Sequence, residues 1–230
     1  MNRDGFTLLK NNLTSPWLDQ LNFDWSEILH LGKKVTFKKD SILYHAGDPI
    51  DFVYIILYGR VQLYLIHEDG KEKALAIIGK NGLLGEYKKQ KTNDYLTSAQ
   101  TVSDATLVII NKSTFEKYLF DNKILSKQRL EMLSLKLEVI ANSALQLSYD
   151  SSLHRVVRVF LNLAYSYGKE ADDGTIKINM TFTHQEIAYL IGSTRVTVAN
   201  VIKSLIDQQL IKKKGKYYYI LEKNKLLQLL

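Results

Sequence analysis

The spacing of apolar residues changes character about halfway along the chain. Between Val35 and Ile110, short β-branched and aromatic runs such as FVYII, RVQLYLI and ATLVII are separated by turn signals such as HAGDP and KNG. After Asn111 the apolar residues recur every three or four positions, which is the period of a helix. The pattern predicts an antiparallel sandwich or barrel, preceded by a short helix over about residues 16–31 and followed by a helical half.

One apolar stripe runs along the longest helical segment. Its members follow a 3-4-3-4-3 spacing: Leu130, Leu133, Leu137, Ile140, Ala144 and Leu147. This spacing places apolar side chains as the a and d positions of a coiled coil do. It predicts a long helix that forms a dimer interface through these residues. The alternative is a helix that packs on its own domain.

The chain then passes a polar interruption, SYDSS, at residues 148–152, which is a candidate hinge. Asp150 or Ser151 can cap the next helix, LHRVVRVFLNLAYSY, which Gly168 ends. The run TIKINMTF alternates like a strand. Thr183 and Glu186 then form a capping box for the helix HQEIAYLI.

A Gly-Ser pair joins this helix to a second one, TRVTVANVIKSL, which opens on hydroxyl residues and one arginine. Gly192 turns the chain, Ser193 or Thr194 caps the second helix, and its exposed residues fall in its first two turns. That part of a recognition helix enters the major groove of DNA. The basic turn and aromatic strand in IKKKGKYYYI have the composition of a β-wing that meets phosphates, through Lys212, Lys213, Lys214 and Lys216. We expect double-stranded DNA as the partner, contacted by Thr183, Gln185, Ser193, Thr194, Arg195, Val196, Thr197, Asn200, Lys203, Lys214 and Lys216.

Composition agrees with a nucleic-acid partner and excludes several kinds of cofactor and catalytic site. The formal charge is +7 with a pI near 9.3, and the chain has no cysteine, which excludes disulfides and iron–sulfur ligation. No metal-binding His pair, Gly-rich phosphate loop or nucleophile elbow is found, so an enzyme is not expected. The amino terminus lacks the apolar core of a signal peptide and no stretch suits a membrane span, so the expected location is cytoplasmic.

The run FTHQEIAYLIGSTRVTVANVIKSLIDQQLI resembles the winged helix-turn-helix of the CRP/FNR family of bacterial transcription factors. AGDPIDFVYIILYGRVQLYL and GLLGEY resemble the turn glycines and the Gly-Glu pair of that family's cyclic-nucleotide-binding-type β-roll. The resemblance implies an α+β chain of three parts: an N-terminal antiparallel β-roll sensor domain (residues 1–112), a long dimerisation helix (113–149) and a C-terminal winged helix-turn-helix domain (150–230). It implies a homodimer on a palindromic operator, and contacts with RNA polymerase if the protein is an activator.

Departures from the family pattern bear on the effector. Cyclic-nucleotide binders of the family carry a phosphate-binding arginine some ten residues after the Gly-Glu pair, whereas this chain has no arginine from Glu86 to Phe115. The hydroxyl pair that meets the purine in the cyclic-AMP receptor aligns with Ile140 and Ala141. An anionic phosphate without its bidentate partner would bind poorly, so control by cyclic AMP is not expected.

Several modes of control remain open. One is an apolar or aromatic effector with a polar handle, bound by Tyr64, Gly85, Glu86, Tyr87, Tyr95, Leu96, Thr97, Leu137, Ile140 and Ala141. No cofactor is expected, since none of the five histidines has the spacing or setting of a haem or metal ligand. The alternatives are a ligand-independent regulator controlled by its expression level or a protein partner, and a dimeric ligand-binding module that does not read DNA.

The recognition helix also departs from the cyclic-AMP receptor. Arg195 matches an arginine that reaches guanine or the adjacent phosphate in the family's nitrogen-control branch, which has a run similar to GSTRVTV. Val196 and Asn200 stand where the cyclic-AMP receptor has the base-reading Glu and Arg. Valine can touch a thymine methyl and asparagine prefers adenine, so we expect a two-fold-symmetric operator that is richer in A·T in its half-site centre.

Overall fold

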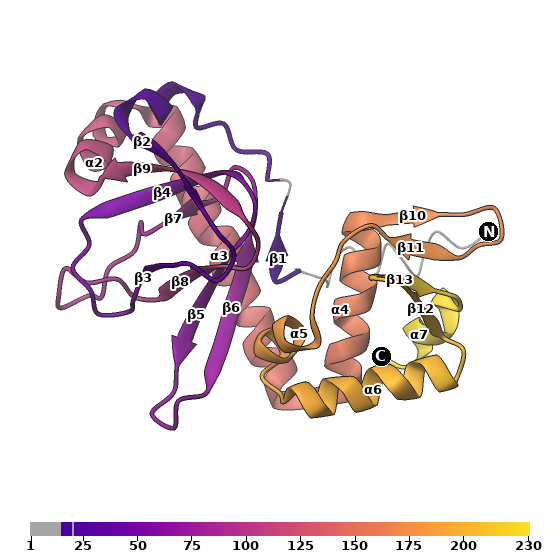
Figure 1. Ribbon diagram of the computed structural model, residues 1–230. Helices are drawn as coiled ribbons and strands as arrows, with labels where there is room; N and C mark the ends of the chain where they lie inside the picture. Colours follow the sequence, from indigo (N-terminus) through magenta and orange to yellow (C-terminus); the bar gives the residue numbers. More distant parts are fainter. Residues whose placement is uncertain (1–14, 20) are drawn as a thin grey trace. The chain divides into compact units, whose positions relative to one another are not determined.

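The computed structural model describes residues 15–19 and 21–230. They form two compact units, Pro16–Ile140 and Ala141–Leu230 (Figure 1). The first unit is rich in strands and the second combines helices with a small sheet, so the α+β class predicted from the sequence is confirmed. Within residues 15–19 and 21–230, no helix has both the length and the apolar character needed to cross a membrane.

Two sheets make up the β-roll. One has the order β1-β6-β5-β8-β3 and the other β2-β9-β4-β7, and every pair except β1 with β6 is antiparallel. The strands are β1 (Trp17–Leu18), β2 (Lys33–Phe37), β3 (Ile42–Tyr44), β4 (Phe52–Tyr58), β5 (Val61–Ile66), β6 (Glu72–Ile78), β7 (Leu83–Leu84), β8 (Ser98–Thr101) and β9 (Ala105–Asn111).

The prediction of a helix over residues 16–31 is wrong for the first part of that range. Trp17 and Leu18 form strand β1, and only Ser26–Leu31 is helical, as a 3-10 helix, η1. The backbone explains the difference, because Ile77 N donates to Pro16 O at 2.9 Å and Gly79 N donates to Leu18 O at 2.8 Å. Pairing with β6 therefore overrides the local helical pattern, which sequence spacing alone does not reveal.

Apolar side chains pack on both faces of the second sheet. Between the sheets lies a core that includes Tyr44, Tyr54, Tyr95 and Leu107. On the other face, Trp25 and Ile28 pack with Phe115 and Leu119 of α2 (Lys112–Asp121). Asn111 caps α2 by accepting from Ser113 N at 3.0 Å, so the last residue of β9 also begins the helix.

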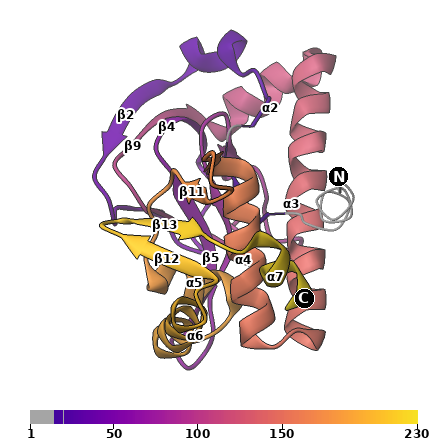
Figure 2. The same cartoon turned by 90° about the vertical axis from the view of Figure 1, so that its right-hand side faces the viewer.

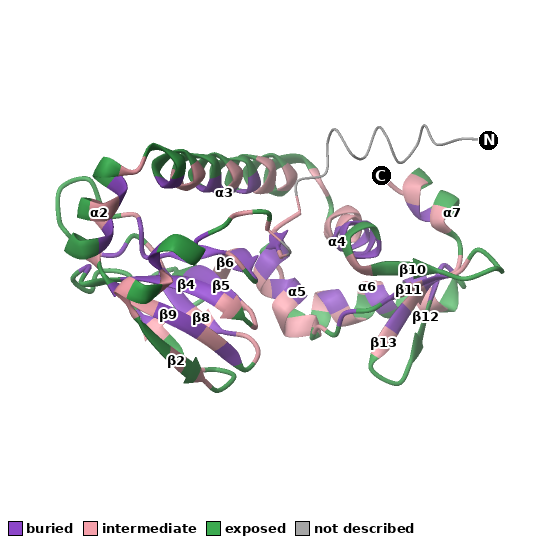
Figure 3. Ribbon diagram, turned by 90° about the horizontal axis from the view of Figure 1, so that it is seen from above, coloured by how far each residue is buried: buried purple, intermediate pink, exposed green. Residues whose placement is uncertain are grey.

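Helix α3 (Lys123–Tyr149) follows and has two different sides (Figure 3). Its buried residues are Leu125, Met132, Lys136 and Val139, and Val139 belongs to the core between the sheets. The sequence-predicted stripe lies on the more exposed side of the helix: Leu130, Leu133, Leu137, Ile140, Ala144 and Leu147. The residues that hold α3 on the β-roll are therefore not those of the stripe.

The C-terminal unit contains the winged helix-turn-helix. Its elements are α4 (Ser152–Tyr167), β10 (Gly168–Glu170), β11 (Ile176–Ile178), α5 (His184–Ile191), α6 (Arg195–Asp207), β12 (Ile211–Lys214), β13 (Tyr217–Ile220) and α7 (Lys223–Gln228). The sheet has the order β10-β11-β13-β12, and Figure 2 shows β12 and β13 as an antiparallel hairpin. Phe160 of α4 lies edge-on to Phe182 and Tyr218, with ring centroids 5.7 and 5.2 Å away. This aromatic core fixes the wing to α4.

Candidate DNA-binding surface and sensor site

Side-chain caps define where the two helices of the helix-turn-helix begin. The predicted capping box is present: Glu186 N donates to Thr183 Oγ1 at 3.1 Å, and Thr183 N donates to Glu186 Oε2 at 2.6 Å. Gly192 ends α5 in the left-handed conformation at φ 62°, which glycine adopts without strain. Thr194, one of the two predicted caps, accepts from Thr197 N at 3.0 Å and begins α6.

Helix α6 separates buried from exposed residues as the sequence pattern predicts. Val198, Ile202 and Leu205 are buried, and Val201 is half-buried. The predicted DNA-contacting residues Arg195, Val196, Asn200 and Lys203 are exposed, and the valine exposes 69% of its surface. Packing within the described residues does not explain why so much of the valine is exposed beside an arginine.

The other predicted contact residues surround this helix start. Thr183 and Thr194 are exposed, while Gln185, Ser193 and Thr197 are half-buried. The two threonine hydroxyls at the start of α6 are 2.9 Å apart, from Thr194 Oγ1 to Thr197 Oγ1. These hydroxyls therefore have a structural role in the cap besides any contact with DNA.

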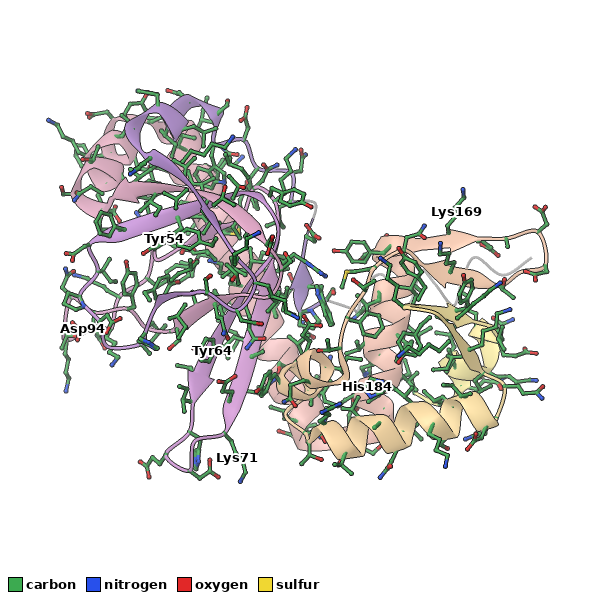
Figure 4. The ribbon with its side chains drawn as sticks, in the orientation of Figure 1. Tyr54, Tyr64, Lys71, Asp94, Lys169 and His184 are labelled. Atoms are coloured by element: carbon green, nitrogen blue, oxygen red, sulfur yellow. The ribbon has the colours of Figure 1, made fainter. Side chains whose placement is uncertain are left out.

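His184 directly follows the predicted contact residue Thr183, at the start of α5 (Figure 4). Its Nε2 is 2.8 Å from Tyr218 Oη, so it joins the start of α5 to the wing. Burial lowers the pKa of His184, and the positive charges of Lys213 and Arg195 lower it further. The sequence signal for this role is its position directly after the N-cap Thr183.

The wing presents lysines and tyrosines in register across the β12–β13 hairpin. Lys212, Lys213, Lys214 and Lys216 are exposed, whereas Tyr218 is buried and Tyr217 and Tyr219 are half-buried. Lys212 Nζ lies 5.4 Å from the ring centroid of Tyr219, and Lys216 Nζ lies 5.5 Å from that of Tyr217. The sequence pattern does not predict Lys177 of β11, whose Nζ is 4.4 Å from the centroid of the Tyr217 ring.

No ion pair compensates the cations of this surface within the described parts of the chain. Arg195, Lys203 and the four wing lysines form no ion pair with any residue in 15–19 or 21–230. Uncompensated cations around an exposed helix start attract a polyanion.

The candidate sensor site lies where the Gly-Glu pair faces α3. Gly85 has φ 77°, and a Cβ atom there would lie 2.7 Å from Phe52 O, so this position requires glycine. Glu86 Oε1 forms an ion pair with Lys136 Nζ of α3, with 1% and 6% of their side-chain surfaces exposed. Lys136 Nζ also donates to Leu83 O at 2.7 Å and lies 4.9 Å from the Tyr87 ring centroid. The sequence does not predict this role of Lys136, because a single lysine beside the leucine stripe carries no signal for burial.

Tyrosine side chains occupy the region where the family's phosphate-binding arginine is expected. The rings of Tyr95 and Tyr44 stack with their centroids 3.9 Å apart, and Tyr95 Oη donates to Phe52 O at 2.8 Å. Tyr54 lies beside them, with its ring centroid 5.5 Å from that of Tyr44 (Figure 4). Burial raises the pKa of all three hydroxyls, so these side chains stay uncharged. They offer no cation for a phosphate.

The predicted effector residues do not all lie together. Gly85, Glu86 and Tyr95 are buried and adjacent, Tyr87 is half-buried beside them, and Thr97 lies near the Tyr44 hydroxyl. Tyr64 is buried on β5, near Ser98. Four others are exposed instead of lining this site: Leu96, Leu137, Ile140 and Ala141. Val139 and Lys136 face the β-roll in their place, on the side of α3 that also buries Leu125 and Met132.

No cluster of three or more histidine, aspartate or glutamate side chains that could hold a metal occurs in the part of the chain that the structure describes.

Comparison with known proteins identifies the same two parts. Residues 34–122 match the cyclic nucleotide-binding domain, and residues 154–229 match the Crp-like helix-turn-helix domain. The global nitrogen regulator of Nostoc sp. is 30% identical over 76% of this chain and 79% of its own length. The chain belongs to the CRP/FNR family of transcription regulators. It is therefore a regulator with a helix-turn-helix DNA-binding domain, and its family consists of regulators and not of enzymes.

Other CRP/FNR relatives carry names that point to different roles. The CRP-like cAMP-activated global transcriptional regulator of Mycobacterium tuberculosis is 27% identical, over 84% of this chain and 85% of its own length. Among solved structures, a variant of CooA from Carboxydothermus hydrogenoformans matches with a TM-score of 0.76 and 20% identity, over 100% of this chain and 96% of that chain. FixK2 from Bradyrhizobium japonicum matches with a TM-score of 0.72 and 18% identity, over 86% of this chain and 96% of that chain. At these identities the structural matches establish the fold of this CRP/FNR regulator.

Proposed function

We propose that this CRP/FNR regulator acts as a homodimer that reads a two-fold-symmetric operator through the start of α6. The observation that carries the proposal is the exposed group of Arg195, Val196 and Asn200 directly after the Thr194 cap. The wing lysines supply phosphate contacts on the same unit. Two such units bind half-sites one helical turn apart, about 34–36 Å.

The exposed apolar stripe of α3 supports the dimer. Leu137 exposes 62% of its surface, and Leu130, Leu133, Ile140 and Leu147 are exposed with it. Apolar residues at a and d spacing on an exposed helix side are buried when a second copy of the helix packs against them. Dimerisation through this stripe brings together two DNA-binding units.

The operator is expected to be richer in A·T than the cyclic-AMP receptor's site in the centre of each half-site. Arg195 is the candidate for a guanine or phosphate contact. Val196 can touch a thymine methyl but accepts no hydrogen bond, and Asn200 suits adenine. Contacts with RNA polymerase would follow if the protein is an activator.

Control by an effector other than cyclic AMP is supported by the sensor site. There is no arginine between Glu86 and Phe115, and Tyr95, at the corresponding place, donates its hydroxyl to Phe52 O. Effectors in this family act by shifting the population of DNA-binding arrangements about the hinge that follows the long helix. In this chain the hinge residue Asp150 pairs with Arg158 at 2.7 Å and Ser151 caps α4.

A second candidate is a regulator that needs no small molecule. The observation in its favour is the buried ion pair of Glu86 with Lys136, because the carboxylate of the sensor site is already paired within the chain. Control would then come from the expression level or a protein partner.

Selection of bound sequences from random duplex DNA, by the purified protein with nothing added, tests the proposal. We expect enrichment of a symmetric site with A·T-rich half-site centres. Recovery of TGTGA-type half-sites would contradict the base assignment. Absence of any enriched sequence, with or without a panel of small metabolites, would contradict specific DNA reading by this chain.

A further inference from the structure

We propose that Lys136 is an internal ligand of the sensor site. Its ammonium pairs with the Glu86 carboxylate and holds α3 in the arrangement that binds DNA. This rests on the proposed function, since it assumes that the position of α3 on the β-roll governs operator affinity. The site would then be filled by the chain itself, and Lys136 would be the residue that excludes cyclic nucleotides and other effectors from it.

The ammonium has the contacts of a bound ligand. It pairs with the Glu86 carboxylate, donates to the backbone oxygen of Leu83 and lies over the Tyr87 ring. These three partners belong to one segment of the β-roll, residues 83–87, whereas the lysine comes from α3. The ion pair therefore joins the two elements between which the sequence places the effector.

Stability is a poor explanation for burying this pair. Removing two charges from water costs more than a buried ion pair usually returns, and apolar side chains of the same size often stabilise such a position better. The neighbouring residues on the same side of the helix show that apolar packing is available here, since Met132 and Val139 are buried. A lysine between them specifies one position of the helix, because only that position places its ammonium on Glu86.

The position of α3 also determines which residues it offers to a second copy. Lys136 and Val139 face the β-roll, and as a result Leu137 and Ile140 are exposed. A rotation of α3 that withdraws the ammonium would move the leucine stripe as well. A competing effector would have to leave Lys136 buried without its counter-charge, which is strongly unfavourable.

The test replaces the internal ligand by an external one. Lys136→Ala removes Cγ, Cδ, Cε and the ammonium, and leaves a space that n-propylammonium fits, as engineered cavities bind small molecules of matching shape. Operator affinity is measured on a selected duplex, with n-propylammonium or an equal concentration of sodium as the chloride salt. We expect a decrease of roughly 5- to 150-fold, the usual range for coupled sites, and recovery of most of it with n-propylammonium only.

Lys127→Ala is the matched control, because Lys127 is an exposed lysine on the same helix and pairs with Glu131 at 3.7 Å. It should leave operator affinity unchanged and unresponsive to the amine. Lys136→Met keeps the volume of the stem and decides the question if the alanine variant does not fold. It should be folded, bind the operator weakly and not respond to n-propylammonium.

Operator binding by folded Lys136→Met at the wild-type affinity would overturn the inference, as would a folded Lys136→Ala variant whose affinity falls without recovery by the amine. A wild-type protein that selects no duplex would instead contradict the proposed function, so the two failures are distinguishable.

Discussion

Arg195 is the first residue of α6, exposed and without an ion pair among the described residues, which makes its contribution to DNA reading directly measurable. Arg195→Ala should cost about 1–3 kcal/mol of binding free energy and relax specificity at one base position, because alanine cannot donate the bidentate hydrogen bonds to guanine. Titration of single-base operator variants measures both effects. Lys225→Ala, an exposed lysine of α7 paired with Glu222, is the control. An equal decrease on all operator variants would assign Arg195 to a phosphate instead.

His184, near the same surface, should make the free energy of unfolding depend on pH. Burial, Lys213 and Arg195 hold its pKa below the ordinary 6.5, so the native protein keeps the ring neutral where the unfolded chain protonates it. The unfolded state then binds more protons, and the free energy of unfolding should fall as the pH drops through 6.5 and below. Well above pH 6.5 the ring is neutral in both the native and the unfolded state, so His184 no longer makes the free energy of unfolding depend on pH.

Urea denaturation at a series of pH values checks this expectation. His184→Gln should show a smaller decline in stability on acidification than the wild type, and His45→Gln controls for removal of an exposed histidine. A decline of equal size in the wild type and His184→Gln would show that burial and the charges of Lys213 and Arg195 do not act on this ring.

The lysines of the wing are expected to act together, because they lie in register on one hairpin. Replacing Lys212, Lys214 and Lys216 by Gln should weaken binding to all duplexes alike, since phosphate contacts carry no base information. The slope of log affinity against log salt should become flatter by about 1 for each phosphate that the variant no longer neutralises. Lys127→Gln on α3 is the control, and a changed base preference in the wing variant would contradict the phosphate assignment.

Helix α3 gives a second expectation at this scale. Leu137→Glu places a charge in the centre of the exposed stripe and should convert the dimer to a monomer, because a buried unpaired carboxylate is strongly unfavourable. Sedimentation equilibrium measures the change, and circular dichroism checks that the fold is kept. Glu138→Gln, on an exposed neighbouring position, should leave the dimer intact. A dimeric Leu137→Glu protein would place the interface elsewhere.

Local patterns predict these elements well where the structure depends on neighbours in sequence. The capping box of Thr183 and Glu186, the Thr194 cap and the buried side of α6 all follow from spacing over a few residues. Strand β1 has a helical pattern and is nevertheless a strand, because it pairs with β6, some sixty residues away. The sensor site is predicted incompletely for the same reason: Lys136 meets Glu86 only through the fold, and an isolated lysine in a helix normally indicates solvent exposure.

For the whole molecule, the net charge of +7 acts together with the exposed cations of the C-terminal unit. A basic surface raises the rate of association with DNA, and this gain declines with salt. Under the proposed function, specificity comes from the few exposed side chains at the start of α6, and affinity comes from two such units in a dimer. Under the further proposal, the site at Glu86 and Lys136 determines whether a small molecule is needed.

The most direct test of this account is the affinity and stoichiometry of the purified protein on its selected duplex, measured with and without saturating cyclic AMP. We predict two chains per symmetric duplex, much weaker binding to a duplex with one half-site, and no change on adding cyclic AMP. One chain per duplex, or tight binding that appears only with cyclic AMP, would contradict the account.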